Sequence, residues 1–286
     1  MIPGSFDYFA PRSIPEAIEL LSAHRDDVKV LSGGQSLLPL MKMRLSKPGY
    51  VVDIGKIPGL DGIVEEGNSL VLGALVTHAQ IEYSELLQKR CPLLPQTAAT
   101  IADIQIRNRG TIGGSVAHAD PAGDMPAAIM ALDAEIKVAG PSGERWIKAD
   151  DFFLGLLMSV LEPDEIVSAV KVPFTDKDKT AYLKAAPRSS GFAVVGVAVR
   201  MTIDSAGICA RAALGITGIS DKAYRPDRSE EILSGKKLDS KIIAEAAAES
   251  TRNIDVIEDI NGSSEYRTHL THIYVQRAIE AALQAK

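Results

Sequence analysis

The chain has 286 residues, of which 46% are hydrophobic and 24% are charged, a composition typical of a folded globular protein long enough for two domains. Its 31 Lys and Arg residues against 37 Asp and Glu residues give a net charge of −6, and no basic run is longer than Lys236-Lys237, which argues against a nucleic-acid-binding protein. No stretch approaches the ~18 apolar residues of a membrane span, and the first residues lack a secretory signal pattern, so we expect a cytoplasmic protein without a membrane span.

The first part of the chain predicts a helix, a buried strand and a glycine loop, in that order. Ser13 and Glu16 form a capping-box pattern, which predicts a helix that ends near His24. An apolar run over 28–31 predicts a strand, and Ser32-Gly33-Gly34-Gln35-Ser36 follows it directly, ahead of an apolar segment that begins at Leu37. The next predicted elements are a strand over 50–53, a hairpin of 62–65 and 69–73, a helix from Thr77 toward Leu87 and a helix over 92–101.

A second glycine-rich stretch occupies residues 109–125. It contains Gly110 and Thr111-Ile112-Gly113-Gly114-Ser115, and then Asp124 ahead of an apolar helical run. Closely spaced glycines let a backbone approach a ligand and turn its N–H groups inward, as in the nests that hold phosphate oxygens, and the hydroxyls of Thr111 and Ser115 add donors. Because two similar loops occur, we interpret them as gripping a diphosphate from two sides. The alternative for each loop alone is a tight turn at the end of a strand.

Several other kinds of site are not indicated. No Gly-x-Gly-x-x-Gly follows the predicted strand and no Gly-x-x-x-x-Gly-Lys-Ser/Thr occurs, which weighs against Rossmann and Walker-type nucleotide sites. Cys91 and Cys209 are far apart, and His269 and His272 have no further ligands at metal spacing, so we expect no metal site and no iron–sulfur cluster on this chain. No Ser-His-Asp or Cys-His arrangement is recognisable, and we assign no catalytic residue.

The second half of the chain changes from mixed elements to strands followed by helices. Before the change, we predict a hairpin of 134–139 and 144–148, a short helix from Asp150, a strand over 166–172 and a charged interdomain linker over 175–179. After it, we predict strands over 181–186, 193–203 and 208–216, and helices over 229–234, 240–251 and 264–285. This order predicts a small α+β domain whose antiparallel sheet is covered on one face.

With these motifs in order, nearly the whole chain resembles the medium, FAD-binding subunit of the molybdenum hydroxylases, the superfamily of xanthine dehydrogenase and carbon monoxide dehydrogenase. The resemblance rests on both glycine loops, on Met1-Ile2-Pro3-Gly4-Ser5-Phe6-Asp7-Tyr8 and on Glu265-Tyr266-Arg267. It implies an α+β fold with a two-part FAD-binding domain of the PCMH type over 1–175, made of two small α/β subdomains at about 1–57 and 58–175. A C-terminal α+β domain of the CO dehydrogenase flavoprotein type is implied over 180–286.

The resemblance also implies roles for individual residues. It assigns the diphosphate of FAD to the two glycine loops and the ribityl or ribose hydroxyls to Asp124, and it places Leu161, Lys184 and Phe192 close to the isoalloxazine ring. A lysine there can stabilise negative charge on a reduced flavin. The implied FAD-binding set is Ser32, Gly33, Gly34, Gln35, Ser36, Leu37, Ile101, Ala102, Gly110, Thr111, Gly113, Gly114, Ser115, Asp124, Leu161, Lys184 and Phe192.

Each of these side chains has an alternative that needs no flavin. Asp124 could be only a helix N-cap, Leu161 a core residue, Lys184 a solvated strand residue and Phe192 a packing residue. The roles of two arginines beside the second loop also have alternatives. Arg107 and Arg109 could neutralise the diphosphate, meet an acidic partner surface, or lie exposed with neither task.

The function that the resemblance implies is electron transfer within a complex. A large subunit carries the molybdenum cofactor and oxidises the substrate, a small subunit carries two [2Fe–2S] clusters, and this chain passes electrons from the clusters to a quinone, NAD or oxygen. A dimer of heterotrimers is implied. Two alternatives stay open: a stand-alone FAD oxidoreductase with its own substrate site, and a non-catalytic binding or scaffold protein whose glycine loops are only turns.

The sequence departs from the carbon monoxide dehydrogenase pattern at four positions. Gln35 stands where His is usual, Ser115 and His118 stand where Asn is usual, and Phe192 stands where a Tyr stacks on the flavin. We expect FAD binding to persist, because the backbone at the glycines does most of that work. The departures favour an aldehyde or an N-heteroaromatic compound over CO as the substrate of the complex.

Overall fold

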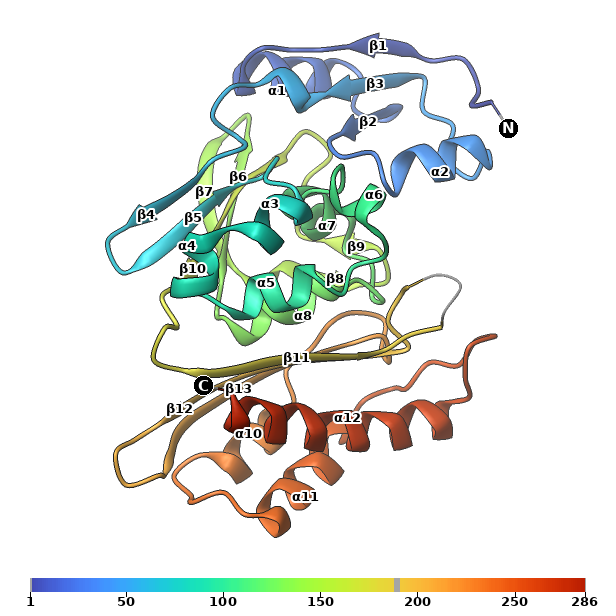
Figure 1. Cartoon of the computed structure of the whole chain (residues 1–286). Coiled ribbons are helices and arrows are strands. Elements are labelled where there is room, and N and C mark those ends of the chain that lie inside the picture. The colour runs from blue at the N-terminus through green and yellow to red at the C-terminus, as the bar shows by residue number, and fades with distance from the viewer. Residues whose placement is uncertain (1, 188–190, 286) are drawn as a thin grey trace.

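The computed structural model describes residues 2–187 and 191–285, and it stacks three main sheets with their helices (Figure 1). The first sheet is parallel, in the order β1-β3-β2. Ser13 caps the first helix as predicted, by accepting a hydrogen bond from the N–H of Glu16 (3.3 Å). The elements of this part are β1 (Asp7–Phe9), α1 (Ile14–Ala23), β2 (Val28–Leu31), α2 (Leu37–Lys42), β3 (Tyr50–Asp53) and the 3-10 helix η1 (Ile54–Lys56).

The second sheet has the order β4-β5-β10-β6-β7, and each of its strand pairs is antiparallel. This second part therefore combines an antiparallel sheet with helices, and it contains both predicted hairpins, as β4-β5 and β6-β7. Its elements are β4 (Ile63–Glu66), β5 (Ser69–Gly73), α3 (His78–Tyr83), α4 (Glu85–Arg90), α5 (Leu93–Ala98), α6 (Ile104–Arg107), α7 (Ile112–His118), α8 (Asp124–Ala131), β6 (Glu135–Gly140), β7 (Gly143–Lys148), α9 (Ala149–Phe152) and β10 (Ile166–Pro173), with a small hairpin of β8 (Phe153–Gly155) and β9 (Met158–Ser159). Ser84 ends α3 and caps α4, so the helix predicted from Thr77 toward Leu87 is in fact two helices.

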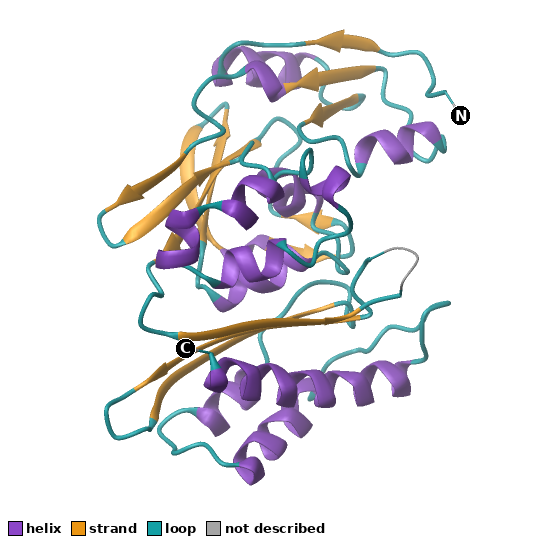
Figure 2. Ribbon diagram, in the orientation of Figure 1, coloured by secondary structure: helices purple, strands orange, loops and turns teal. Residues whose placement is uncertain are grey.

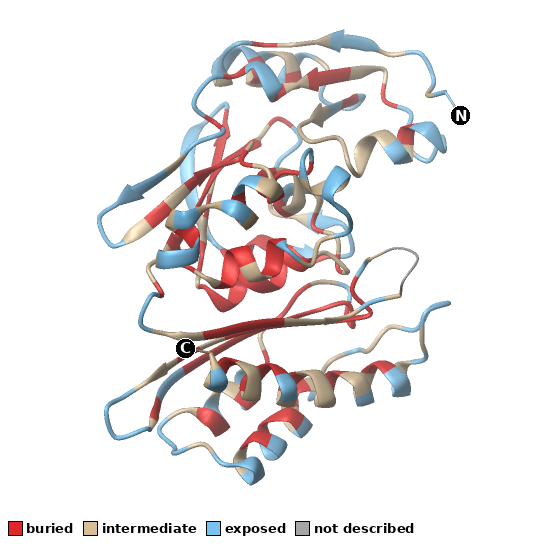
Figure 3. Cartoon of the chain, viewed as in Figure 1, coloured by how far each residue is buried: buried red, intermediate tan, exposed pale blue. Residues whose placement is uncertain are grey.

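The third sheet is antiparallel, as predicted, in the order β11-β12-β13. Its elements are β11 (Lys179–Ala185), β12 (Val195–Ile203), β13 (Cys209–Thr217), α10 (Asp227–Leu233), α11 (Ser240–Ala248), η2 (Glu249–Thr251) and α12 (Ser264–Gln284). Helix α12 packs on one face, while α5 and α8 from the second part pack on the other, so the prediction of a sheet covered on one face is wrong (Figure 2). Helix α8 is accordingly buried along its whole length (Figure 3).

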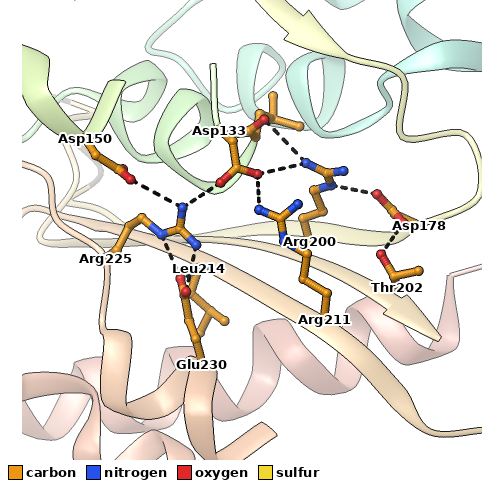
Figure 4. A network of polar contacts seen from close by, with 10 residues as sticks. Asp133, Asp150, Asp178, Arg200, Thr202, Arg211, Leu214, Arg225 and Glu230 are labelled. Atoms are coloured by element: carbon orange, nitrogen blue, oxygen red, sulfur yellow. Dashed lines mark hydrogen bonds and ion pairs between the residues drawn. The ribbon is translucent and has the colours of Figure 1, made fainter. Parts of the chain in front are cut away.

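A network of charged groups joins the third part to the second (Figure 4). Asp133, just after α8, accepts hydrogen bonds from Arg200 (3.1 Å), Arg211 (2.5 Å) and Arg225 (2.7 Å). Arg200 on β12 also donates to Asp178 (2.6 Å), and both side chains are nearly buried. The predicted linker therefore does not run free in solvent, because Asp178 within it is fixed by this ion pair.

The apolar cores follow the same division into three. The largest lies between the second sheet and its helices and reaches Tyr182 on β11, and the others lie under the first sheet and between the third sheet and α12. Within the described residues, no helix is both long enough and apolar enough to cross a membrane.

Candidate functional site

The first glycine loop, residues 32–36, leaves the end of β2 and enters α2, whose first residue is Leu37. Gly34 has a φ of +76°, a left-handed conformation that glycine adopts without strain. Among the described residues, the N–H groups of Gly33, Gly34 and Gln35 donate to no other group, whereas the side chain of Gln35 donates back to the carbonyl of Gly33 (3.4 Å). The loop therefore presents free backbone donors, as the nest interpretation requires.

The two glycine loops touch each other, although they are far apart in the sequence. The hydroxyls of Ser32 and Thr111 are 2.8 Å apart. Gly33 lies so close to the backbone before Thr111 that a Cβ at this position would be 2.1 Å from the carbonyl oxygen of Arg109. Only glycine fits there, and the contact joins the two loops into one polar surface between the first and second parts.

The second loop differs from the prediction, because its glycines lie in the first turn of α7 and not in an open loop. Thr111 is the N-cap of this helix. The N–H groups of Ile112, Gly113 and Gly114 donate to the carbonyls of Val76 (2.9 Å) and Ala74 (3.0 Å) and to the hydroxyl of Thr111 (3.1 Å), respectively. The predicted inward nest is therefore wrong at these residues. The second loop can instead bind a ligand through two hydroxyl groups, those of Thr111 and of the partly buried Ser115.

Asp124 lies in the first turn of α8, where Gly123 is the N-cap, so the capping alternative is wrong. Its carboxylate is buried and faces β11. One oxygen accepts from the hydroxyl of Tyr182 (2.5 Å), and the other accepts from the ammonium of Lys184 (3.0 Å). Burial raises the pKa of Asp124, and the charge of Lys184 opposes that rise. Both oxygens are thus bonded inside the protein.

Lys184 is likewise buried, with a side chain that is only 6% exposed, so the solvated-residue alternative is wrong. Besides Asp124, its ammonium donates to the carbonyls of Thr100 (2.7 Å) and Gly191 (2.7 Å). An ammonium has three N–H donors, and all three are used. Lys184 can therefore act on a ligand through its charge and through the backbone that it holds, but it has no spare hydrogen bond to give.

Two of the remaining predicted segments, 101–102 and 191–192, adjoin or include backbone that Lys184 holds. Ala102 has a φ of +40° and packs under Gly191, next to Phe192, whose side chain is 54% exposed. Leu161 is partly buried against the central core, as its core alternative predicts. The structure thus brings the 101–102 segment and the 191–192 segment together, about the buried Lys184.

Arg107 and Glu82 form an ion pair that the sequence does not indicate. The guanidinium of Arg107 donates to the carboxylate of Glu82 (2.7 Å) and to the carbonyl of Ile101 (3.0 Å), and its side chain is 13% exposed. It is therefore committed within the protein and does not neutralise a diphosphate. A Glu and an Arg 25 residues apart carry no sequence pattern that predicts this pair.

Comparison with known families shows which protein family this chain belongs to. Residues 4–175 match the family described as the FAD binding domain in molybdopterin dehydrogenase, and residues 180–282 match the CO dehydrogenase flavoprotein C-terminal domain. The chain belongs to the FAD-binding medium subunits of the molybdenum hydroxylases. It is therefore a subunit of an oxidoreductase complex, and it binds FAD.

Full-length relatives support this membership. The carbon monoxide dehydrogenase medium chain of Hydrogenophaga pseudoflava is 38% identical over 99% of this chain and 98% of that protein. The nicotine 6-hydroxylase medium subunit of Paenarthrobacter nicotinovorans is 41% identical over 96% of both chains. Among solved structures, carbon monoxide dehydrogenase from Hydrogenophaga pseudoflava, in a form that lacks the Mo-pyranopterin moiety, superposes with a TM-score of 0.96 at 39% identity over 99% of each chain.

The residues of the site fit an FAD diphosphate. The N–H groups of Gly33, Gly34 and Gln35, which donate to no other described residue, directly follow Ser32, whose hydroxyl pairs with that of Thr111. Such neutral donors hold phosphate oxygens without a cation, and the medium subunit of this family would bind the diphosphate there.

Proposed function

We propose that this subunit carries electrons from [2Fe–2S] clusters on a small partner subunit to an external acceptor, while a large partner subunit oxidises the substrate at its molybdenum cofactor. The acceptor is a quinone, NAD or oxygen, and the complex is a cytoplasmic dimer of heterotrimers. Within the chain, residues 1–175 form the FAD-binding domain and residues 180–286 the C-terminal domain. Bound FAD supplies the link between carriers of single electrons and acceptors of electron pairs.

The observation that carries this proposal is the contact between the two glycine loops. We infer that the diphosphate lies across the contact, held by the N–H groups of residues 33–35 and by the hydroxyls of Ser32, Ser36, Thr111 and Ser115. The isoalloxazine ring then extends toward Ala102, Leu161 and Phe192. Ala102 packs against Gly191, whose carbonyl is held by the buried Lys184, and Phe192 follows Gly191 in the chain. Asp124 acts on the flavin end through its ion pair with Lys184, since both of its oxygens are bonded to protein groups.

The substrate of the complex is proposed to be an aldehyde or an N-heteroaromatic compound. The four departures from the carbon monoxide dehydrogenase pattern support this, and one of the relatives is named for nicotine. Gln35 illustrates how mild the departures are for FAD binding, because its side chain bonds within its own loop (3.4 Å) and leaves the backbone donors free.

Turnover by the chain alone tests the subunit role. We expect the purified flavin-loaded chain to show no oxidation of aldehydes, purines or nicotine with a dye acceptor, because the substrate site is on another subunit. Activity should appear when the large and small subunits of the same complex are co-expressed with it. Turnover without partners would contradict the proposal and favour a stand-alone flavin oxidoreductase.

A further inference from the structure

The segment Thr100-Ile101-Ala102 is held in an unusual backbone conformation. Ala102 has a φ of +40°, a left-handed conformation that strains an L-residue with a Cβ. Gly191 covers it so closely that a Cβ on Gly191 would lie 3.1 Å from the Cα of Ala102. Such strain persists only where surrounding contacts impose it, and here two buried cations do so.

The first cation is Arg107, at the end of α6. Its Nη1 atom donates to two successive carbonyls, those of Ile101 (3.0 Å) and Ala102 (3.4 Å), and its Nε atom donates to Glu82 (2.7 Å). The side chains of Arg107 and Glu82 are 13% and 15% exposed. The carboxylate balances the buried charge and fixes the direction of the guanidinium.

The second cation is Lys184, which reaches the same segment from the third sheet. It donates to the carbonyl of Thr100 (2.7 Å), the residue just before the two that Arg107 holds. Its other donors hold Gly191, which covers Ala102, and the carboxylate of Asp124. Three successive carbonyls, those of residues 100–102, are thus turned toward two cations, each paired with its own carboxylate.

This arrangement decides where the neighbouring N–H groups point. In a trans peptide group the C=O and the following N–H point in opposite directions. With the carbonyls of Ile101 and Ala102 directed at Arg107, the N–H groups of Ala102 and Asp103 are directed away from it. Within residues 2–187 and 191–285, neither N–H donates to another group. The segment therefore presents two adjacent donors without a partner among the described residues.

We propose that Arg107 and Lys184, each with its carboxylate, are positioning residues that aim the N–H groups of Ala102 and Asp103 at hydrogen-bond acceptors on the edge of the isoalloxazine ring. The inference rests on the proposed function, since it needs FAD in the site. It predicts that the glycine loops bind the diphosphate half of FAD, and that the two cation–carboxylate pairs contribute only to binding of the flavin half.

Comparing FAD with ADP tests this division, because ADP has the diphosphate but no flavin. The test variants remove each pair as a unit, Glu82→Gln with Arg107→Met and Asp124→Asn with Lys184→Met, so that no lone buried charge remains. Affinities of the flavin-free full chain are measured by flavin fluorescence for FAD and by calorimetry for ADP. We expect each double variant to bind FAD at least about tenfold more weakly, and ADP within about threefold of wild type.

A matched control removes another buried pair, Asp178→Asn with Arg200→Met, whose side chains are 8% and 11% exposed and touch neither segment. This control should leave both affinities unchanged. Arg107→Lys keeps the positive charge but lacks the planar guanidinium with its several N–H donors. This variant should fold and lose part of the FAD affinity. Equal weakening of FAD and ADP, or unchanged FAD affinity, would overturn the inference. A wild-type chain that binds ADP but no FAD would instead overturn the proposed function.

Discussion

Replacing Gly33 with alanine is expected to lower the affinity for FAD by at least about 100-fold, and the affinity for ADP by a similar factor. The added Cβ would lie 2.1 Å from the carbonyl oxygen of Arg109 and 2.8 Å from the Cα of Gly110, so the two glycine loops must separate. Separation would also break the 2.8 Å contact of Ser32 with Thr111, which helps to form the diphosphate surface. Titration of the flavin-free chain with FAD and with ADP measures both affinities.

The control for this prediction is Gly62→Ala, because a Cβ on Gly62 has no neighbour within 4 Å and its backbone needs no left-handed conformation. Circular dichroism and thermal unfolding show whether each variant is folded. A folded Gly33→Ala variant with wild-type FAD content would mean that the diphosphate does not lie across the contact of the two loops.

Acidification is expected to destabilise the chain through His78, the first residue of α3. Burial and, to a smaller extent, the charge of Arg107 together lower the pKa of His78 from 6.5 to about 4. Between these two values the unfolded chain binds a proton that the folded chain excludes, so the free energy of unfolding falls as the pH falls. The contribution is fully present above pH 6.5, and about 3 kcal/mol of it is lost by a pH of about 4.

Denaturant unfolding of wild type and His78→Leu at pH ~7 and pH ~4 measures this effect, since leucine cannot titrate. The variant should lose less stability on acidification than wild type by about the same 3 kcal/mol. His269→Leu is the control, because His269 is exposed, and it should follow wild type. An identical loss in wild type and His78→Leu would show that His78 is not the group that titrates. The imidazole of His78 lies against Gly110, where an added Cβ would be 2.9 Å from its Cδ2 atom, so protonation of the ring should also disturb the second loop.

Local patterns in the sequence were enough to predict most elements. Strands over 28–31 and 50–53 match β2 and β3 residue for residue, because short apolar runs bounded by polar turns define them. The helix predicted from Thr77 does begin there, and Thr77 forms a capping box with Gln80. The family and its cofactor were also predictable, because the two glycine loops occur in a fixed order in a chain of suitable length.

The polar contacts of the site could not be predicted, since they join residues that are distant in the sequence. Thr111 caps α7, so the glycines beside it pack against Ala74 and Val76 and present no free N–H groups. Nothing near Lys184 in the sequence indicates that Thr100, Asp124 and Gly191 occupy its three donors. These partners come from separate elements, and only the packing of α5 and α8 against the third sheet brings them together.

The visible absorption spectrum of the purified chain, followed by acid release and chromatography of the chromophore, tests the central claim most directly. We predict a flavin spectrum, FAD released at close to one per chain, and no iron–sulfur shoulder until the partner subunits are co-purified. A colourless chain that takes up no added FAD would contradict the account, and so would an iron–sulfur spectrum from this chain alone.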